Sequence, residues 1–388
     1  MSRNVKGGGE RMRKVVYVQY TAPSAYTILR SGAKVLAKRD WSIWFFGVAS
    51  RGNANEIVFD AVPHTEIRTL SKPPSGSLWR LHFALFTIWC VGYLLRLRPE
   101  VVYGSNIYSA PVLWFFRRVL RGRTIYHEHD PPEPSVDDAS VFKRRLRSMA
   151  VASARICIVP GEERAAEFKA RYPTADVYSA WNTVDADDIE GVPEPVEPER
   201  PIVLWYHGAI VESQLPLALI GAVQRIPTIH LKFAGPSPVG QTGYLQRFLA
   251  AANASQINDR VTYLGVIPKR ADLLQHMRAA HIGLCLFATP FRAPMVGASQ
   301  KVFEYLSCGL ALLAPNTTEW VDFVGTNGIG RVCDTAEFTD FEPVLTEMIA
   351  DRDCLDTMRL RSVERVRDEW HYATSFQPIV EWMEGAPS

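Results

Sequence analysis

Short apolar runs alternate with amphipathic segments along almost the whole chain. Runs of four to eight apolar or β-branched residues predict strands, and a 3.6-residue repeat of apolar positions predicts helices. In the first half we expect strands over 15–20, 42–48, 66–70, 101–104, 124–127 and 156–160. Helices are expected between them, over 26–39, 78–97, 110–120, 142–154 and 162–172.

The same alternation restarts in the second half. Residues 185–200 are rich in Pro and Glu and lack apolar periodicity, which is typical of an exposed linker. After them we expect strands over 202–206, 230–234, 261–264, 282–286 and 310–314. The expected helices cover 215–225, 244–252, 271–279, 299–308, 341–350, 353–370 and 373–383.

Apolar strands that alternate with helices indicate parallel βαβ units whose sheet is covered on both faces. We therefore expect an α/β protein with two Rossmann-like, doubly wound domains. Their expected bounds are 1–186 and 201–370, joined by a linker over 187–200, with a final helix in 371–388 that packs back toward the first domain. Ligands bind at the carboxyl ends of such strands, so the site is expected in a cleft between the domains.

The composition fits this picture. With 388 residues, 47% hydrophobic and 22% charged, the chain is typical of a folded protein of two or three domains and unlike a disordered or fibrous one. We find no stretch of the ~18 uninterrupted apolar residues that a transmembrane helix needs and no apolar stretch in the polar first 13 residues. Six scattered cysteines form no CxxC pair. We therefore expect a cytoplasmic protein without a zinc site or disulfide framework.

The near-neutral net charge of +2 hides an asymmetry. Residues 1–186 hold 27 Lys and Arg against 16 Asp and Glu, whereas the remainder holds 16 against 25. A basic half indicates an anionic partner such as a membrane, a nucleic acid or a polyanionic substrate, unless local ion pairs dissipate the charge. Nucleic acid is disfavoured, because the basic residues flank apolar helices rather than a platform for stacked bases.

The most informative segment is 299–309, which predicts a short helix with marked ends. Ser299 is a typical N-cap residue, and Gly309 is typical of the position after the last turn. A helix start preceded by small residues offers backbone N–H groups and a positive dipole end to phosphate, and Lys301 would add charge. Glu304 could accept hydrogen bonds from a ribose diol. On spacing alone, a surface ion pair between Lys301 and Glu304 fits equally well.

Residues 301–315, KVFEYLSCGLALLAP, resemble the nucleotide-sugar signature of the GT-B glycosyltransferases, and in particular of retaining family 4. The resemblance extends over nearly the whole chain, and Asn182 resembles the Asn that closes the first domain in that family. It implies that Glu304 holds the donor ribose and that the loop before it cradles the diphosphate of a UDP or GDP sugar. The other donor-binding residues that it implies are Gly208, Gly265, Val266, Gly297, Ala298, Ser299 and Gln300.

Two features depart from that family. Its paired glutamates follow an E-x7-E pattern, but Val296 stands where the first Glu would be. The sugar would then be held by the backbone of Gly297 and Ala298, or by polar residues nearby such as Ser299. The family also often has an Arg and a Lys after the first donor-domain strand, and residues 207–212 contain neither. Lys301 and Arg292 are the expected replacements, since a departing diphosphate needs cationic or backbone partners.

The acceptor side is expected in the first domain. His129 ends a predicted strand and matches the histidine that reaches toward the donor sugar in the resembling family. Glu128 and Asp130 beside it are candidates for contact with acceptor hydroxyls or for a base, and Ser24 lies in the loop after the first strand. The HEHD run could also hold a metal, but no further His or Cys cluster completes a ligand shell. The loop after the first strand is not a GxGxxG, which disfavours a dinucleotide oxidoreductase.

Two other patterns bear on function. Asp185 and Asp187 spell DxD, which we interpret as a solvated acidic turn. Residues 83–95 form an uncharged run that Arg80, Arg96 and Arg98 flank, and more Arg and Lys follow over 117–147. Aromatic and basic residues together are typical of a lipid headgroup interface, although a buried core helix would explain the run as well.

The sequence therefore predicts a glycosyltransferase without a resident cofactor. The resemblance implies a metal-independent and retaining enzyme. The basic and aromatic helices of the first domain indicate peripheral contact with an anionic membrane, which a lipid-linked or glycan acceptor would explain. Two alternatives stay open: a nucleotide-sugar 2-epimerase of the same architecture, and an inactive GT-B binding subunit, which Val296 would favour. The sugar, the nucleobase and the oligomeric state cannot be deduced from the sequence.

Overall fold

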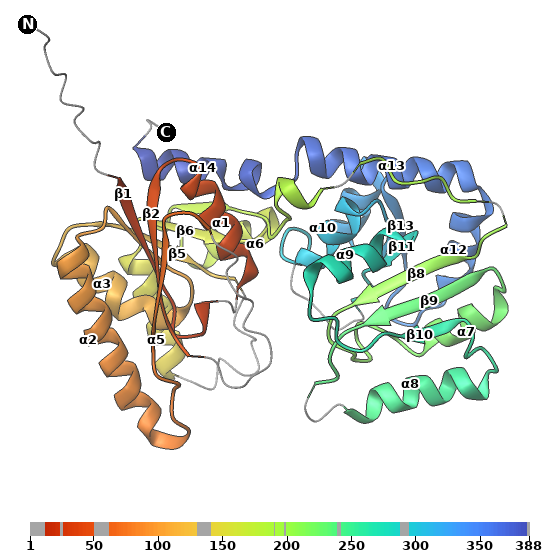
Figure 1. Ribbon diagram of the computed structural model, residues 1–388, viewed down its shortest axis with the longest axis horizontal. Helices are drawn as coiled ribbons and strands as arrows, with labels where there is room; N and C mark the ends of the chain where they lie inside the picture. The colour runs from red at the N-terminus through yellow and green to blue at the C-terminus, as the bar shows by residue number, and fades with distance from the viewer. Residues whose placement is uncertain are drawn as a thin grey trace, which may run out of the picture. The chain divides into compact units, whose positions relative to one another are not determined.

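The computed structural model describes residues 12–23, 26–49, 62–129, 141–189, 191–197, 199–238, 242–287 and 295–385. The chain divides into two compact units. The first unit consists of Met1–Ala180 and Phe376–Ser388, and the second consists of Trp181–Ser375. Each unit contains one parallel sheet with helices on both of its faces (Figure 1). The prediction of an α/β protein with two doubly wound domains is thus confirmed.

Seven parallel strands form the sheet of the first unit, in the order β3-β2-β1-β4-β5-β6-β7. They are β1 (Arg13–Val18), β2 (Trp41–Val48), β3 (Thr65–Leu70), β4 (Val101–Gly104), β5 (Arg123–His127), β6 (Ile156–Val159) and β7 (Val177–Ser179). The connecting elements are α1 (Thr27–Ala37), η2 (Gly76–Leu78), α2 (Trp79–Leu97), η3 (Ile107–Ser109), α3 (Ala110–Arg118), α5 (Val141–Ser153) and α6 (Glu162–Arg171). The strand order reverses between β1 and β4, where doubly wound folds bind ligands.

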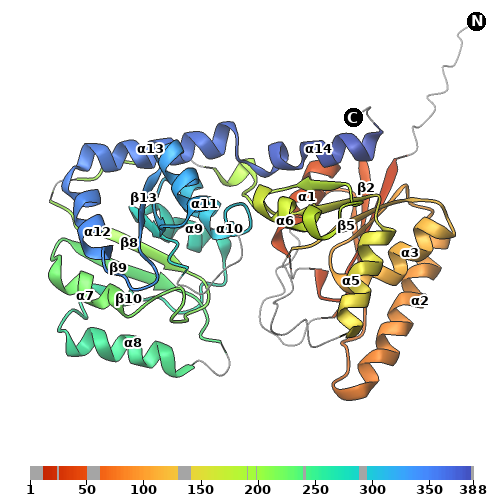
Figure 2. The same cartoon turned by 180° about the vertical axis from the view of Figure 1, so that it is seen from behind.

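The strands are apolar on both sides because both faces of the sheet are covered. In β1, Val16 and Val18 are fully buried and belong to a core with side chains of α2, α3 and α5. Helix α1 lies on the opposite face of the sheet (Figures 1 and 2), and its spacing buries Leu29, Ala33 and Leu36. Burial of these apolar faces, rather than local helix propensity, is what holds such short helices in place.

Six parallel strands form the second sheet, in the order β10-β9-β8-β11-β12-β13. They are β8 (Ile202–His207), β9 (Ile229–Ala234), β10 (Val261–Tyr263), β11 (Ile282–Leu284), β12 (Ala311–Pro315) and β13 (Gly330–Cys333). The helical elements are η4 (Ala186–Asp188), α7 (Ala218–Arg225), α8 (Thr242–Ala254), α9 (Arg270–Arg278), α10 (Gln300–Ser307), α11 (Thr318–Trp320), η5 (Val321–Gly325), α12 (Phe341–Ala350) and α13 (Arg352–Asp368).

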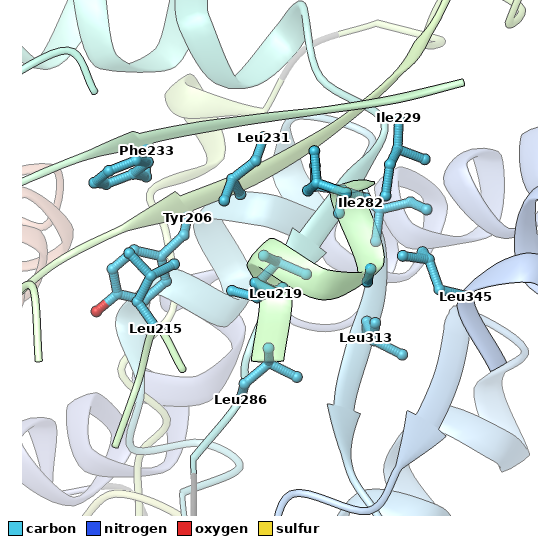
Figure 3. Packing of buried hydrophobic residues seen from close by; sticks show 14 of the residues in the cluster. Tyr206, Leu215, Leu219, Ile229, Leu231, Phe233, Ile282, Leu286, Leu313 and Leu345 are labelled. Carbon is cyan, nitrogen blue, oxygen red and sulfur yellow. The ribbon is translucent and has the colours of Figure 1, made fainter. Parts of the chain in front are cut away.

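The core on one face of the second sheet joins helices α7 and α12 to its central strands. Figure 3 shows Leu219 of α7 and Leu345 of α12 close to Ile229, Leu231 and Ile282 from the strands. All five side chains are at most 1% exposed. A second core on the other face contains side chains of α9, α10 and α11. The two cores fix the carboxyl ends of β8 and β11, between which the strand order reverses.

Residues 187–200, for which we expected an exposed linker, lie in the second unit. Val196 is 5% exposed, and its N–H donates to the Asp356 carboxylate, 2.9 Å to Oδ2. Arg359 of α13 donates to the carbonyl of Glu194 at 2.7 Å. Glu194 and Val196 are therefore held against α13.

The last helix, α14 (Tyr372–Glu384), begins in the second unit and continues into the first. Arg123 donates to the carbonyl of Met383 at 2.9 Å, and its guanidinium lies 4.3 Å from the ring centroid of Trp382. Arg39 pairs with Glu384 at 3.2 Å. These contacts fix the end of the chain on the first unit.

Several short elements were not predicted, among them β7, β13, η3, η4, α11 and η5. Strands β7 and β13 are edge strands of three and four residues. Segments this short carry too few residues for a periodic pattern, and only pairing with a neighbouring strand gives them their conformation.

Candidate functional site

Helix α10 is the centre of the candidate site in the second unit. Ser299 has the extended N-cap conformation, with φ −89° and ψ 102°, but its side chain makes no capping hydrogen bond. Gly309 has φ +72° and ends the helix, with Leu310 N–H donating to the carbonyl of Tyr305 at 3.0 Å. The expected helix ends are confirmed. Phe303, fully buried, is one of the side chains that fix the helix to the sheet.

Glu304 projects from α10 into a buried polar network. It is 6% exposed, and its two oxygens accept different hydrogen bonds, from His207 Nε2 at 2.9 Å and from Arg270 Nη1 at 2.5 Å. Burial by itself would raise the pKa of Glu304, but the hydrogen bonds that His207 and Arg270 donate and the charge of Arg270 outweigh it and lower the pKa below its usual value. The side chain is therefore a carboxylate at neutral pH, and a carboxylate accepts stronger hydrogen bonds than a neutral oxygen.

His207, at the end of β8, has a tautomer that its neighbours define. The indole Nε1 of Trp205 donates to His207 Nδ1 at 3.1 Å, and an indole nitrogen can only donate. His207 Nδ1 is therefore the acceptor, so Nε2 carries the proton that is donated to Glu304. Sequence analysis noted only that residues 207–212 lack Arg and Lys and missed this role. The sequence did offer a signal for this role, because His207 directly follows a predicted strand and ligands bind at the carboxyl ends of such strands.

Arg270, the first residue of α9, was also missed. It pairs with Asp188 at 2.9 Å and with Glu304 at 2.5 Å. Burial would lower the pKa of Arg270, but the charges of Glu304 and Asp188 raise it above its usual value. Asp188 directly follows the DxD run, so this acidic turn contributes one carboxylate to the network.

Lys301 does not pair with Glu304, contrary to the surface-pair alternative. Its ammonium donates to Gln214 Oε1 at 2.7 Å and lies 4.9 Å from the ring centroids of Tyr206 and Phe287. Burial lowers the pKa of Lys301 to about 8, although Cys285 and Glu304 oppose the shift. The ammonium group of Lys301 thus lies beside two aromatic rings, where water solvates its charge only weakly.

Three glycine turns lie side by side at the carboxyl ends of β8, β9 and β10. Gly208, Gly235 and Gly265 have φ of +132°, +138° and +73°, a region that disfavours side chains. Gly235 N–H donates to the carbonyl of Gly265 at 2.8 Å, and a Cβ at Gly235 would lie 1.9 Å from the carbonyl oxygen of Gly208. The structure thus brings Gly208 and Gly265 together through Gly235, which we did not predict. Val266 is 52% exposed beside them.

The loop before α10 is fixed from two sides. Asn182 donates through its backbone N–H to the carbonyl of Gly297 at 2.6 Å and through Nδ2 to that of Ala298 at 2.9 Å. The Glu319 carboxylate accepts the N–H groups of Met295 at 3.1 Å and Val296 at 2.8 Å. These hydrogen bonds fix the conformation of the loop at the helix start, which contains Gly297, Ala298, Ser299 and Gln300. Glu319 was not predicted, because it lies 23 residues from Val296 along the chain.

In the first unit, His129 lies in a cluster of aromatic rings. It stacks on Tyr26 with centroids 4.1 Å apart and contacts His127 at 3.9 Å. Neither of its ring nitrogens has a hydrogen-bond partner among the described residues, and it is 5% exposed. Burial lowers the pKa of His129 to about 3, so its imidazole is neutral at pH 7.

Glu128 faces away from this cluster, because successive residues of an extended segment point to opposite sides. It is 7% exposed and forms a two-pronged ion pair with Arg147, at 2.6 and 2.7 Å. Tyr126 donates to the same carboxylate at 3.0 Å. We expected Glu128 to contact an acceptor, but the structure shows it holding α5 against the sheet.

Three predicted site residues, Ser24, Asp130 and Arg292, lie outside the described residues. Within the part of the chain that the structure describes, no group of three or more His, Cys, Asp or Glu side chains could hold a metal ion. The six cysteines are free, and five of them are buried.

Comparison with known proteins identifies the fold. No family model and no curated protein sequence matches the chain. Among solved structures, the Anabaena protein HepE in complex with UDP and glucose is 17% identical with a TM-score of 0.72. The alignment covers 96% of this chain and 100% of the HepE chain. Sucrose-phosphate synthase from Thermosynechococcus elongatus is 16% identical with a TM-score of 0.73, covering 97% and 100% of the two chains.

A third similar structure is WaaG, a glycosyltransferase involved in lipopolysaccharide biosynthesis. It is 13% identical with a TM-score of 0.66, and 96% of this chain covers 100% of WaaG. The similarity spans both units in each comparison, so the chain has the GT-B fold of nucleotide-sugar glycosyltransferases.

Proposed function

We propose that the protein is a glycosyltransferase that uses a nucleotide-diphosphate sugar, UDP- or GDP-linked, as its donor. The main support is the ionised Glu304 carboxylate, fixed by His207 and Arg270 beside the glycine turns of the second unit. Such a carboxylate suits a ribose diol, which offers two hydroxyl donors. The similar Anabaena structure contains UDP and glucose, which agrees with this donor class.

In the proposed complex the donor lies along the ends of β8, β10 and α10. The backbone at Gly265 and Val266 contacts the nucleobase, and Glu304 accepts the ribose hydroxyls. The diphosphate lies at the start of α10, against the loop of Gly297, Ala298, Ser299 and Gln300 and beside Gly208. Amide groups at a helix start favour phosphate through their dipoles and hydrogen bonds.

Transfer breaks the bond between the sugar C1 and the diphosphate oxygen, and the electron pair leaves with the diphosphate. The acceptor hydroxyl oxygen bonds to C1 and its proton passes to the departing phosphate. Lys301 and the loop amides stabilise the charge that develops there, so we propose a metal-independent reaction. Arg292 is the second proposed cation. Retention of configuration is proposed from the resemblance to family 4.

His129 is proposed to hydrogen-bond the donor sugar as a neutral imidazole. Its two buried nitrogens lack partners among the described residues, and unpaired buried polar groups are costly unless a ligand pairs with them. A pKa near 3 makes it a hydrogen-bonding group rather than a base at neutral pH. Replacing His129 with Ala should therefore lower turnover more than UDP affinity; equal turnover in the variant would remove it from the site.

We propose further that the basic first unit contacts an anionic membrane on its cytoplasmic face, where a lipid-linked or glycan acceptor lies. Helix α2 and the end of η2 support this, because their outer side is apolar: Leu78, Leu81, Leu85, Ile88 and Leu95 are 49–67% exposed. The segment Gly76–Leu97 is long and apolar enough to cross a membrane by length and composition alone, and 28% of its most apolar window is buried. A buried core helix can be equally long and apolar, so we propose contact with the membrane interface and not a membrane-spanning helix.

Vesicle sedimentation tests the membrane proposal. Leu85→Glu should weaken binding to vesicles containing anionic lipid at least tenfold, since burying one leucine contributes about 2 kcal/mol. Val192→Glu places the same charge on a side chain of the second unit that is 70% exposed and serves as the matched control. Equal binding of the two variants would contradict the proposal.

The donor proposal is tested by calorimetric titration with UDP, GDP and ADP. Glu304→Ala should weaken the preferred nucleotide by about ten- to a hundredfold, because a hydrogen bond to a charged group contributes about 1.5–3 kcal/mol. Unchanged affinity would show that the ribose lies elsewhere. Conversion of the sugar in the absence of acceptor would indicate the 2-epimerase. Tight binding without turnover across acceptors would indicate an inactive subunit, which Val296 favours.

A further inference from the structure

The side chain of Gln214 lies beside Lys301 in the second unit and comes from the turn between β8 and α7. Its Oε1 accepts a hydrogen bond from the Lys301 ammonium at 2.7 Å and another from the Tyr206 hydroxyl at 3.0 Å. An ammonium group can only donate, so the atom that faces it must be the amide oxygen. The chemistry of its neighbours therefore fixes the orientation of this amide.

The turn that carries Gln214 is itself held by the end of β8. The Tyr206 hydroxyl also lies 2.6 Å from the carbonyl oxygen of Ala209, and Gln214 N–H donates to the carbonyl of Val211 at 3.1 Å. Tyr206 is fully buried in the core on one face of the second sheet. The position of the Gln214 amide is thus tied to the sheet through Tyr206.

The ammonium that Gln214 holds lies next to the turn after β8. A Cβ built on Gly208 would lie 3.8 Å from Lys301 Nζ, so the ammonium is at the turn that is proposed to lie beside the donor diphosphate. Among the described residues, Gln214 is the one hydrogen-bond acceptor of Lys301, whose ammonium has three N–H donors. N–H groups of the ammonium therefore stay available for a bound anion.

Gln214 holds the ammonium without cancelling its charge. A carboxylate at this position would form an ion pair with Lys301 and offset its attraction for a phosphate, whereas a neutral amide accepts the hydrogen bond and leaves the net charge in place. Glu304, one turn further along α10, is paired with His207 and Arg270 instead. The second unit therefore contains a cation that is oriented but not neutralised.

We propose that Gln214 is a positioning residue, which orients Lys301 toward the donor diphosphate and leaves its positive charge uncompensated. The inference rests on the proposed donor site and adds to it a residue that acts through Lys301. Affinity for a nucleoside diphosphate and stabilisation of the departing diphosphate both depend on that charge. Sequence analysis did not single out Gln214, because its role depends on a partner 87 positions away.

The charge that Gln214 orients can be followed by pH, because the groups around Lys301 do not titrate with it. Burial lowers the pKa of Lys301 to about 8. Cys285 after β11, Tyr206 of β8 and Glu304 of α10 face it. Burial raises the pKa of Cys285 to about 12 and that of Tyr206 above its usual value, whereas the lowered pKa of Glu304 keeps it ionised. Among these four groups, only Lys301 changes its charge as pH rises from neutral through about 8.

NMR titration of the full chain labelled with 13C-lysine measures the pKa of Lys301 directly, and Lys301→Met identifies its signal. Gln214→Glu keeps the size of the side chain and adds a negative charge, so it should move the midpoint from about 8 to about 9 or higher. Gln214→Leu removes the acceptor of the ammonium, so its midpoint should fall below that of the unaltered protein. Gln246→Glu and Gln246→Leu make the same changes at an exposed position of α8 and should leave the midpoint unchanged.

Calorimetric titration with UDP at neutral pH gives the second reading. Both Gln214 variants should weaken UDP about fivefold or more, Gln214→Leu because the ammonium is no longer oriented and Gln214→Glu because the carboxylate offsets its charge. The pH at which UDP affinity falls should move down in Gln214→Leu and up in Gln214→Glu. A merely structural role would weaken UDP in both variants without moving the pH dependence in opposite directions.

Equal Lys301 midpoints in the unaltered protein and in both Gln214 variants would overturn the proposal. Equal UDP affinity in Gln214→Leu and Gln246→Leu would overturn it as well. The two readings keep this inference apart from the donor site on which it rests. Absence of UDP binding in the unaltered protein contradicts the donor site and the inference together, whereas intact UDP binding with unmoved midpoints contradicts only the role of Gln214.

Discussion

Lys301 and Glu304 do not form the ion pair that their spacing along α10 would allow. The two residues lie one turn apart on α10 but contact different partners. Glu304 is paired by His207 and Arg270, and Lys301 is held by Gln214 and by aromatic rings. The chemistry of the site thus depends on residues that are distant in sequence, such as Gln214, 87 positions from Lys301.

The proton on His207 Nε2 leads to a prediction about Glu304. His207→Gln keeps an N–H donor at the position of Nε2, whereas His207→Phe keeps the ring shape and removes the donor. We expect His207→Phe to weaken UDP about tenfold or more, since a buried carboxylate that loses a donor costs about 1.5–3 kcal/mol, and His207→Gln to recover most of that loss. Isothermal titration calorimetry measures both. If the two variants bind UDP alike, the hydrogen bond is not what positions Glu304.

The lowered pKa of Lys301 leads to a prediction about pH. Burial favours the neutral amine, so the ammonium loses its proton as pH rises through about 8. Affinity for UDP should therefore fall between pH 7 and pH 9 in the unaltered protein. Lys301→Arg keeps its charge over this range and should bind with little change, and Lys301→Met should bind weakly at both values. A flat pH profile in the unaltered protein would contradict this role.

Helices and strands place these residues at one edge of the second sheet. Helix α10 has the bounds that its end residues predicted, because a cap position and a left-handed glycine act locally. The contacts between the glycine turns after β8, β9 and β10 could not be predicted from the sequence, because they join residues 27 and 30 positions apart that only the sheet brings together. Loop 295–299 likewise depends on Asn182 and Glu319, which only the fold brings to it.

The close approach of Gly235 to Gly208 can be tested with one methyl group. Gly235→Ala should lower the free energy of unfolding by about 2 kcal/mol or more and weaken UDP binding, because the added Cβ meets the Gly208 carbonyl in a strained backbone region. Gly243→Ala is the control, since a Cβ there meets no atom within 4 Å. Chemical denaturation and UDP titration give the two readings. A Gly235→Ala protein as stable as the control would refute the contact.

At the scale of the whole molecule, the chain returns to its first unit after completing the second. Phe376, Ile379, Val380 and Met383 of α14 are at most 1% exposed, and Arg123 and Arg39 hold the end of the helix. The basic charge and the exposed apolar side of α2 belong to the first unit, whereas the donor-site network belongs to the second. The two proposed binding functions are thus carried by separate parts of the fold.

This division predicts that damage to α14 affects one unit selectively. Ile379→Ala removes a fully buried side chain and should cost about 2–5 kcal/mol of stability in the first unit. Scanning calorimetry should show the transition of that unit at a lower temperature, with UDP affinity unchanged. Pro378→Ala, at the adjacent exposed position inside the helix, should not destabilise it. Loss of UDP affinity in Ile379→Ala would show that the units are not independent.

The sequence by itself determined the parallel strands, most helices and the two doubly wound sheets, and it singled out Glu304 and Lys301 as candidate site residues. It could do so because apolar periodicity and helix-end residues act over a few positions. Tertiary structure decided which partners these side chains meet: it added His207, Arg270, Gly235 and Glu319 and turned Glu128 toward Arg147. It also placed Glu194 and Val196 against α13. Such pairings join residues far apart along the chain, and no local pattern contains them, because they form only when buried surfaces pack.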